Sequence, residues 1–165
     1  MPKKKIDTKS LIDKIEKVTR ERMTKGEVVN LDEFRRVTKK DEPLTVLVID
    51  DDETIRSGLK RVFEADGLRV LTAADGTQLA SVLDDHPIEL VILDVGLPWI
   101  NGYELAQMMK EHEDLRRIPL IFISARTSEL DVKRGFALGA DDYIKKPFQL
   151  DQIRKTVQTL LKLSH

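Results

Sequence analysis

Cysteine is absent from this sequence, and histidine is scarce. The 165 residues include no cysteine and three histidines, His86, His112 and His165, which stand far apart. These absences exclude disulfides, thiolate metal sites and cysteine nucleophiles, and they leave no histidines at metal-ligand spacing. The lack of cysteine also fits a reducing compartment, so we expect a cytoplasmic protein.

Long apolar runs are missing as well. No stretch approaches the roughly 18 residues that indicate a membrane helix, so we expect no membrane span. The basic start, Met1 to Lys5, is not followed by an apolar stretch of signal-peptide length, and we expect no secretory signal. Charged residues make up 35% of the chain and hydrophobic residues 41%, a mix typical of a globular protein with a hydrated surface.

The charge is divided unevenly along the chain. Residues 1–43 carry 13 Lys/Arg against 9 Asp/Glu, whereas residues 44–165 carry 15 against 20. The asymmetry suggests two parts with different roles. We therefore divide the chain into a helical, basic N-terminal extension, 1–43, and a second domain, 44–165.

The residue pattern of the extension predicts two short helices. Four apolar residues at helical spacing mark the first: Leu11, Ile12, Ile15 and Val18. Asn30 and Glu33 form a capping box at the start of the second. The extension could pack on its own domain, serve as an arm for a partner or a second copy, or contact nucleic acid. Because 9 acids stand among its 13 bases, nucleic acid is the least favoured of these partners.

Residues 44–165 alternate strand and helix signals. Short continuous apolar runs, typical of strands buried on both faces, cover residues 46–49, 68–71, 90–93, 120–123 and 143–145. Amphipathic helical patterns separate the runs and follow the last one. This alternation predicts an α/β, doubly wound, five-stranded parallel sheet in the order 2-1-3-4-5, the flavodoxin-like arrangement.

Complementary polar side chains stand at the carboxyl ends of four of these strands. The first strand leads into Asp50 and Asp51, the third into Asp94, the fourth into Ser124 and the fifth into Lys146. In an open parallel sheet, ligands bind beyond the carboxyl ends where the winding reverses, here between strands 1 and 3. We therefore expect three carboxylates, a hydroxyl and an ammonium to converge on one edge of the sheet.

This set of groups predicts phosphorylation of an aspartate. Clustered carboxylates repel one another and need a cation, for which oxygen ligands and phosphate handling favour Mg²⁺. A carboxylate can attack phosphorus as a nucleophile, while a metal ion, an ammonium and a hydroxyl neutralise the phosphoryl oxygens. Each residue alone also fits a plainer role, such as an acid at a helix N-terminus or Ser124 as a helix cap. The coincidence of four strand ends favours the phosphoryl site.

Five blocks of the sequence resemble the response-regulator receiver domains of two-component signalling. The resemblance covers residues 44–163, and the blocks are Val46–Asp52, Leu90–Pro98, Asn101–Leu105, Pro119–Ala125 and Gly139–Phe148. It implies that Asp94 accepts a phosphoryl group from a histidine kinase or a phosphotransfer protein. It also implies that Asp50, Asp51, Asp94 and the backbone carbonyl of Gly96 hold Mg²⁺. A third acid, Asp52, leaves the pair Asp51 and Asp52 open, but the apolar run ends at Ile49 and favours Asp50 and Asp51.

The resemblance implies a conformational switch as well. Ser124 would hydrogen-bond the phosphoryl group, and Lys146, held by a cis bond to Pro147, would pair with it. Tyr143 would turn inward as Ser124 moves, which would remodel the face of the fourth helix, fifth strand and last helix.

We therefore expect a response regulator that is not an enzyme and that signals through changed protein contacts. Because no further domain follows the last helix in the sequence, we expect a stand-alone receiver, with an unknown target protein and a possible homodimer. One alternative is an aspartate-nucleophile phosphatase, although that class commonly has a second acid where this chain has Gly96. The other is a DNA-binding transcription regulator that uses residues 1–43.

Overall fold

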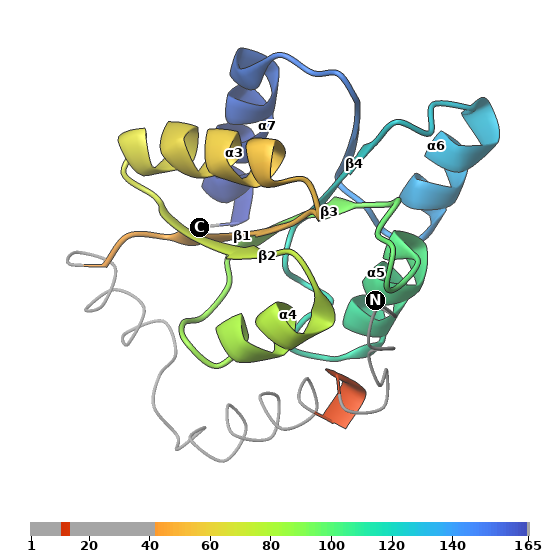
Figure 1. The fold of residues 1–165 in the computed structure, drawn as a ribbon, viewed down its shortest axis with the longest axis horizontal. Coiled ribbons are helices and arrows are strands. Elements are labelled where there is room, and N and C mark those ends of the chain that lie inside the picture. Colours follow the sequence, from red (N-terminus) through yellow and green to blue (C-terminus); the bar gives the residue numbers. More distant parts are fainter. Residues whose placement is uncertain (1–10, 14–41, 165) are drawn as a thin grey trace.

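A five-stranded parallel sheet forms the centre of the structure (Figure 1). The computed structural model describes residues 11–13 and 42–164. The strands are β1 (Thr45–Ile49), β2 (Arg69–Ala73), β3 (Leu90–Asp94), β4 (Leu120–Ser124) and β5 (Asp142–Lys145), and their spatial order is β2-β1-β3-β4-β5. The predicted fold class and strand order are confirmed, and every strand begins within one residue of its predicted apolar run.

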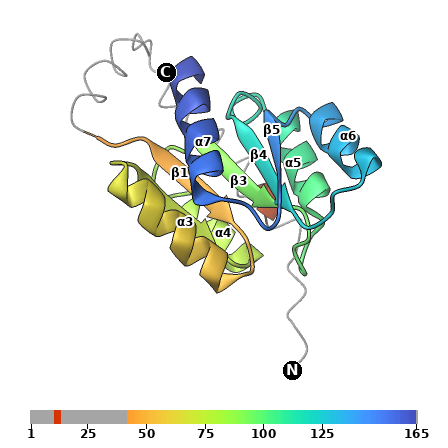
Figure 2. The same cartoon turned by 90° about the horizontal axis from the view of Figure 1, so that it is seen from above.

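Helices cover both faces of the sheet (Figures 1 and 2). On one face lie α3 (Glu53–Ala65) and α7 (Leu150–Ser164), and on the other lie α4 (Gly76–Val82), α5 (Gly102–Glu111) and α6 (Glu129–Ala137). Side chains along a strand alternate between the faces, so Val46 and Val48 enter one core while Leu47 and Ile49 enter the other. None of the described helices is both long and apolar enough to cross a membrane.

A polar side chain caps the start of each of the first four of these helices. The side chains of Asp52, Asp75, Asn101 and Ser128 accept a hydrogen bond from a backbone N–H two or three residues later, at the starts of α3, α4, α5 and α6 respectively. Such bonds satisfy N–H groups that have no partner within the helix. The caps therefore fix where each connection from the carboxyl edge of the sheet ends and its helix begins.

Leu11 packs into the core on the face that carries α4 and α5. Residues 11–13 are helical, and Leu11 is 2% exposed within the same apolar cluster as Leu47, Leu79 and Leu105. The short red segment in Figure 1 lies beside α4 and α5. Residues 11–13 therefore contact the core formed by residues 44–164 of the same chain.

The other predictions for the extension fall outside the described residues. They concern Ile15 and Val18 of the first predicted helix and the capping box of Asn30 and Glu33. The division of the chain at residue 43 therefore stays a prediction.

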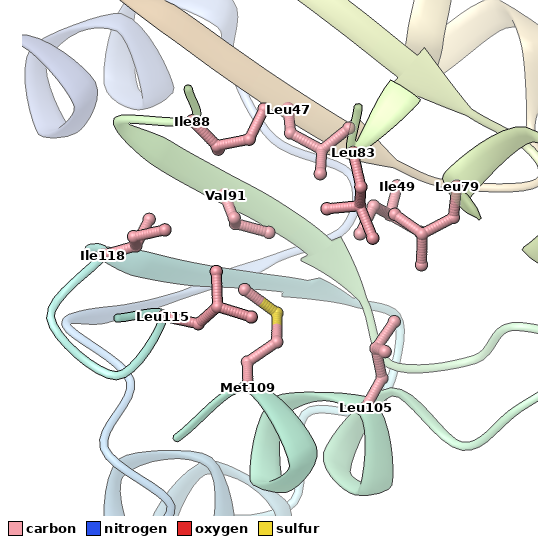
Figure 3. Close-up of a pocket in the computed structure, with 10 residues that line it drawn as sticks. All are labelled: Leu47, Ile49, Leu79, Leu83, Ile88, Val91, Leu105, Met109, Leu115 and Ile118. Atoms are coloured by element: carbon pink, nitrogen blue, oxygen red, sulfur yellow. The ribbon is translucent and has the colours of Figure 1, made fainter. Parts of the chain in front are cut away.

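A small apolar cavity lies within the same core (Figure 3). Its volume is ≈ 20 Å³, and its lining is entirely aliphatic or thioether: Leu47, Ile49, Leu79, Leu83, Ile88, Val91, Leu105, Met109, Leu115 and Ile118. A buried water needs two to four polar partners, which these side chains do not offer. The cavity is a packing gap between α4, α5 and the sheet, and it lies apart from the polar groups at the sheet's edge.

Candidate functional site

Three carboxylates meet where β1 and β3 end. Asp50 follows β1, Asp51 comes next, and Asp94 is the last residue of β3. One carboxylate oxygen from each lies within 4.8 Å of the others. Because β1 and β3 pair in parallel, their carboxyl ends lie side by side. The structure thus brings together the three acids that the sequence places at this edge.

Asp52 serves the neighbouring helix instead of this cluster. Its Oδ1 accepts a hydrogen bond from the backbone N–H of Thr54 at 2.9 Å and so caps α3. Its own N–H donates to Asp50 Oδ1 at 2.8 Å, which helps to hold the Asp50 carboxylate in place. The geometry therefore favours Asp50 and Asp51 over Asp51 and Asp52 as the acidic pair.

Lys146 lies between two of the carboxylates. Its Nζ is 2.9 Å from Asp50 Oδ2 and 3.4 Å from Asp94 Oδ2. The Lys146–Pro147 bond is cis, as predicted. Burial lowers the pKa of Lys146, but the hydrogen bond and charge of Asp50, joined by Asp94, outweigh it and raise the pKa above its ordinary value. The ammonium therefore stays charged at neutral pH.

Asp94 is buried beside another negative charge. Burial raises the pKa of Asp94 and the charge of Asp50 adds to the rise, whereas Lys146 and the Gly96 N–H oppose it without cancelling it. That N–H donates to Asp94 Oδ1 at 3.1 Å. Perturbed acids in clustered sites are candidates for chemistry. Asp94 is thus a buried acid whose surroundings disfavour its charge.

Ser124 lies on β4, the strand next to that of Asp94, and Tyr143 lies on β5, one strand further along the sheet. Ser124 ends β4, is buried, and accepts a hydrogen bond on Oγ from the backbone N–H of Arg126 at 2.9 Å. Tyr143 of β5 lies inward at 8% exposure, and its hydroxyl donates to the Arg126 carbonyl at 2.8 Å. The backbone of Arg126 thus contacts both of the residues that the sequence marks as the switch.

Tyr103 is a neighbour of Tyr143, and the sequence analysis did not identify it. Its hydroxyl lies 3.1 Å from that of Tyr143, although 40 residues separate the two in the chain. The apolar pattern of α5 indicates that this helix has a buried face, but it names no partner for a hydroxyl. No signal in the sequence could have identified this contact.

An open hollow of ≈ 310 Å³ lies beside the site. It is lined by the loop from Val95 to Asn101 and by Arg126. Trp99 in this loop donates its indole N–H to the Ala74 carbonyl at 3.2 Å, so the loop is held to the end of β2. Gly96, which carries no side chain, lies in this lining.

The donor set fits a hard divalent cation. All three clustered side chains offer carboxylate oxygens, the ligands that Mg²⁺ prefers. Among the described residues, the carboxylate of Asp51 has no hydrogen-bond or ion-pair partner, so both of its oxygens are available. The arrangement can thus hold a metal ion next to a buried carboxylate. The Ser124 hydroxyl lies at the end of β4, and the Lys146 ammonium follows the end of β5.

Comparison with known proteins points to one family. The response regulator receiver domain family matches residues 46–158. The Klebsiella pneumoniae transcriptional regulatory protein CpxR is 39% identical over 120 residues, which cover 73% of this chain and 50% of CpxR. The Escherichia coli aerobic respiration control protein ArcA is 37% identical over 116 residues, 70% of this chain and 48% of ArcA. The chain therefore spans about half the length of these curated relatives.

Solved structures agree with the sequence matches. The Francisella response regulator 1452 receiver domain superposes with a TM-score of 0.68 at 29% identity and covers 74% of this chain and 99% of its own. The Vibrio cholerae chemotaxis protein CheY4 gives 0.66 at 27% identity and covers 72% and 98%. CpxR is named a transcriptional regulatory protein. This comparison therefore does not support the expectation that nucleic acid is an unlikely partner. By its family match, its relatives and its fold, the chain belongs to the response regulator receiver domains of two-component signalling.

Proposed function

We propose that Asp94 accepts a phosphoryl group from the phosphohistidine of a histidine kinase or a phosphotransfer protein. The observation that carries this proposal is the meeting of Asp94 with two acids, an ammonium and a hydroxyl at one sheet edge. An Asp94 carboxylate oxygen forms a bond to phosphorus as the phosphorus–nitrogen bond breaks. The electron pair of the broken bond stays on the imidazole, and the product is an acyl phosphate.

Mg²⁺ is the proposed cofactor of this transfer. Asp50, Asp51, Asp94 and the backbone carbonyl of Gly96 would hold it, and when bound it supplies positive charge to the carboxylates and to the phosphoryl oxygens. Gly96 does not block the approach to the Asp94 carboxylate. Even a Cβ at this position would lie 3.9 Å from Asp94 Oδ1, an ordinary contact distance. The three acids repel one another without a cation, so metal binding and readiness for phosphoryl transfer depend on the same residues.

Lys146 and Ser124 supply the remaining groups for the phosphoryl oxygens. Lys146 Nζ already lies 3.4 Å from Asp94 Oδ2, so a small movement would place it against a phosphoryl oxygen on that carboxylate. Ser124 Oγ accepts a bond from the Arg126 N–H, and its own proton can therefore be donated elsewhere. Both residues would stabilise negative charge that the transfer brings into a buried site.

The proposed output is a changed protein contact on the face of α6, β5 and α7. Tyr143 lies in β5 and α6 packs against it, so movement of this side chain would alter that face. Leu130 and Phe136 of α6 and Leu150 of α7 are exposed hydrophobic residues. We propose that a target protein binds there, a second copy of the chain being one such target. We also propose a cytoplasmic location, where histidine kinases present their phosphohistidine.

Control of transcription is a second candidate output, favoured by the similarity to CpxR, a transcriptional regulatory protein. It predicts that the full chain binds duplex DNA and that its affinity falls steeply as salt rises. An aspartate-nucleophile phosphatase is disfavoured, because the position two residues after Asp94 is Gly96 and carries no acid. Steady release of phosphate from a monoester, over many turnovers, would support an enzyme against this proposal.

The central proposal is tested by mass spectrometry of the intact chain. With Mg²⁺ and a small acyl phosphate or phosphoramidate donor, the wild type should gain one phosphoryl group, and Asp94→Asn should gain none. Asp52→Asn is the matched control, because asparagine caps a helix as well as aspartate and the residue lies outside the cluster. If the wild type stays unmodified, or Asp94→Asn is modified equally, the proposal is wrong.

A further inference from the structure

Tyr143 lies in a pocket built by three other elements. Its ring lies 6.0 Å from that of Phe122 in β4, and Phe122 in turn meets the ring of Tyr103 in α5 edge-on at 5.2 Å. The guanidinium of Arg134 in α6 lies 4.7 Å above the Tyr103 ring. Tyr103 itself is 1% exposed. The inward Tyr143 therefore packs as one member of an aromatic cluster that joins β4, β5, α5 and α6.

The hydroxyls of the two tyrosines share more contacts than they have protons. Tyr143 OH lies 2.8 Å from the Arg126 carbonyl, Tyr103 OH lies 3.0 Å from the Asp131 carbonyl, and the two hydroxyls are 3.1 Å apart. Two protons thus serve three contacts. When Tyr143 donates to the Arg126 carbonyl, Tyr103 can give its single proton either to the Asp131 carbonyl or to the Tyr143 oxygen. The second choice exists only while Tyr143 is inward, so the Tyr103 hydroxyl favours that position.

Gly135 of α6 shapes the same pocket from the other side. A Cβ at this position would lie 2.8 Å from Tyr143 Cδ2 and 3.1 Å from both Tyr143 Cε2 and Phe122 Cδ2. The affected atoms belong to buried rings that are held on their other sides, so they cannot move away freely. The missing side chain of Gly135 is thus a condition for the inward position of Tyr143.

We propose that Tyr103 and Gly135 are positioning residues, which define the inward position of Tyr143 and so couple the packing of α5 and α6 to the phosphoryl site. The inference rests on the proposed function, because Tyr143 is the switch only if Asp94 takes the phosphoryl group. Tyr103 is the second residue of α5, directly after the loop that follows Asp94. Gly135 reaches Tyr143 from α6. The two residues therefore connect the phosphoacceptor loop and a helix of the proposed output face to one side chain.

Coupling of this kind is reciprocal. If phosphoryl binding requires the inward Tyr143, a substitution that lowers the fraction of chains with Tyr143 inward weakens phosphoryl binding in proportion to that fraction. Beryllium trifluoride with Mg²⁺ is a suitable probe, because it mimics a phosphoryl group on a carboxylate and binds reversibly. Its affinity is a readout that a purely structural role of Tyr103 or Gly135 would leave unchanged.

The chain offers a direct reporter, because Tyr103 and Tyr143 are its only two tyrosines. Labelled with 3-fluorotyrosine, the wild type gives two fluorine resonances, and Tyr143→Phe identifies the one that belongs to Tyr103. Tyr103→Phe then leaves Tyr143 as the sole reporter. In Gly135→Ala, the Tyr143 resonance should move to the position of a solvent-exposed ring, and beryllium trifluoride should bind about 5-fold more weakly or worse. Tyr103→Phe should weaken the binding of beryllium trifluoride about 2- to 10-fold, which corresponds to the free energy of one neutral hydrogen bond.

Gly58→Ala is the matched control for Gly135→Ala. Gly58 lies within α3, and a Cβ there meets nothing within 4 Å, so it gives the same gain in helix propensity without a new contact. It should leave the resonances and the affinity unchanged.

Two outcomes separate a failure of the proposed function from a failure of this inference. If the wild type binds no beryllium trifluoride, the proposed function fails. If the wild type binds it but both Gly135→Ala and Tyr103→Phe match the wild type in affinity and in the Tyr143 resonance, the coupling inference fails alone. Tyr103→Phe removes a single oxygen and keeps the ring, so we expect it to fold. Its affinity for beryllium trifluoride and its Tyr143 resonance therefore test the coupling even if Gly135→Ala does not fold.

Discussion

Lys146 donates a 2.9 Å hydrogen bond to Asp50 across 96 residues of sequence. The ammonium is closer to this acid than to Asp94, from which it lies 3.4 Å away. Asp50 is fully buried, so the lysine compensates a charge that would otherwise be costly to bury. If a phosphoryl group and Mg²⁺ bind as proposed, the charge of the metal would compensate Asp50, and Lys146 could then contact the phosphoryl oxygens.

Replacing Lys146 by methionine should slow phosphoryl transfer about 100-fold, the usual cost of removing one group that stabilises transition-state charge. The pKa of Asp94 should also rise further, because Lys146 lowers it in the native site. The rate measured against pH should therefore reach its plateau at a higher pH than in the wild type. Lys145→Met, at an exposed position one residue earlier, should leave rate and profile unchanged. Equal rates for the two variants would contradict the role given to Lys146.

Asp94→Asn should make the protein more stable at neutral pH. The pKa of Asp94 is raised in the folded state, so the wild type loses stability as pH rises from the ordinary value of 3.8 through the folded pKa. An amide has no such titration. Urea unfolding at pH 7 should favour the variant by about 0.5–2 kcal/mol, a common gain for stabilising substitutions. The difference should shrink as pH falls below 3.8, and a difference independent of pH would contradict this explanation.

Mg²⁺ should stabilise the wild type, because it binds the folded acid cluster and not the unfolded chain. At a concentration 100 times its dissociation constant, the gain is about 2.7 kcal/mol. Asp51→Asn should lose most of this gain, whereas Asp52→Asn should keep it, since Asp52 caps α3. Thermal unfolding with and without Mg²⁺ measures the effect. Loss of the gain in Asp52→Asn as well as in Asp51→Asn would assign the metal to the other acidic pair, Asp51 and Asp52.

Gly102→Ala should be strongly destabilising, in spite of alanine's helix propensity. A Cβ at Gly102 would lie 2.5 Å from the Asp94 carbonyl oxygen and 2.6 Å from Val95 Cα, and these backbone atoms cannot turn aside. We expect a loss of about 1–3 kcal/mol in the free energy of unfolding. Gly96→Ala is the control, because its Cβ would make only an ordinary contact at 3.9 Å, so its effect should stay within about 0.5 kcal/mol.

Leu11→Ala tests the contact of the N-terminal segment. Truncation of a buried leucine commonly costs 2–5 kcal/mol, and we expect about 2 kcal/mol here, because a segment near a chain end can detach at limited cost. Leu163→Ala, at a residue that is 80% exposed, should change the free energy of unfolding by less than about 0.5 kcal/mol. If both variants unfold at the same urea concentration as the wild type, Leu11 makes no stabilising contact.

The strands and the polar residues at their ends could be predicted because each depends on local sequence. A buried parallel strand is apolar on both faces, so runs such as Val46–Ile49 stand out, and the chain direction then places Asp50, Asp94, Ser124 and Lys146 on one edge. The end of the apolar run at Ile49 already favours Asp50 and Asp51 as the acidic pair, and the structure adds that Asp52 caps α3.

Contacts between side chains that are distant in the sequence could not be predicted. The hydroxyl pair of Tyr103 and Tyr143 depends on the packing angle of α5 against β5, and the closeness of Gly135 depends on how α6 lies across the sheet. Neither follows from periodicity, because a helical pattern gives the buried face of a helix but not its neighbour. The burial of Leu11 was equally hidden, since its spacing predicts an amphipathic helix without saying where that helix packs.

The strand ends that form the site also set the order in which it can be completed during synthesis. β1, β3 and β4 carry the acids and the hydroxyl, but the ammonium arrives only with the residue after β5, the last strand to leave the ribosome. A chain that ends before that point holds three mutually repelling carboxylates without the charge that compensates them. If Lys146 has the proposed role, the site can receive a phosphoryl group at its full rate only after β5 has paired with the rest of the sheet.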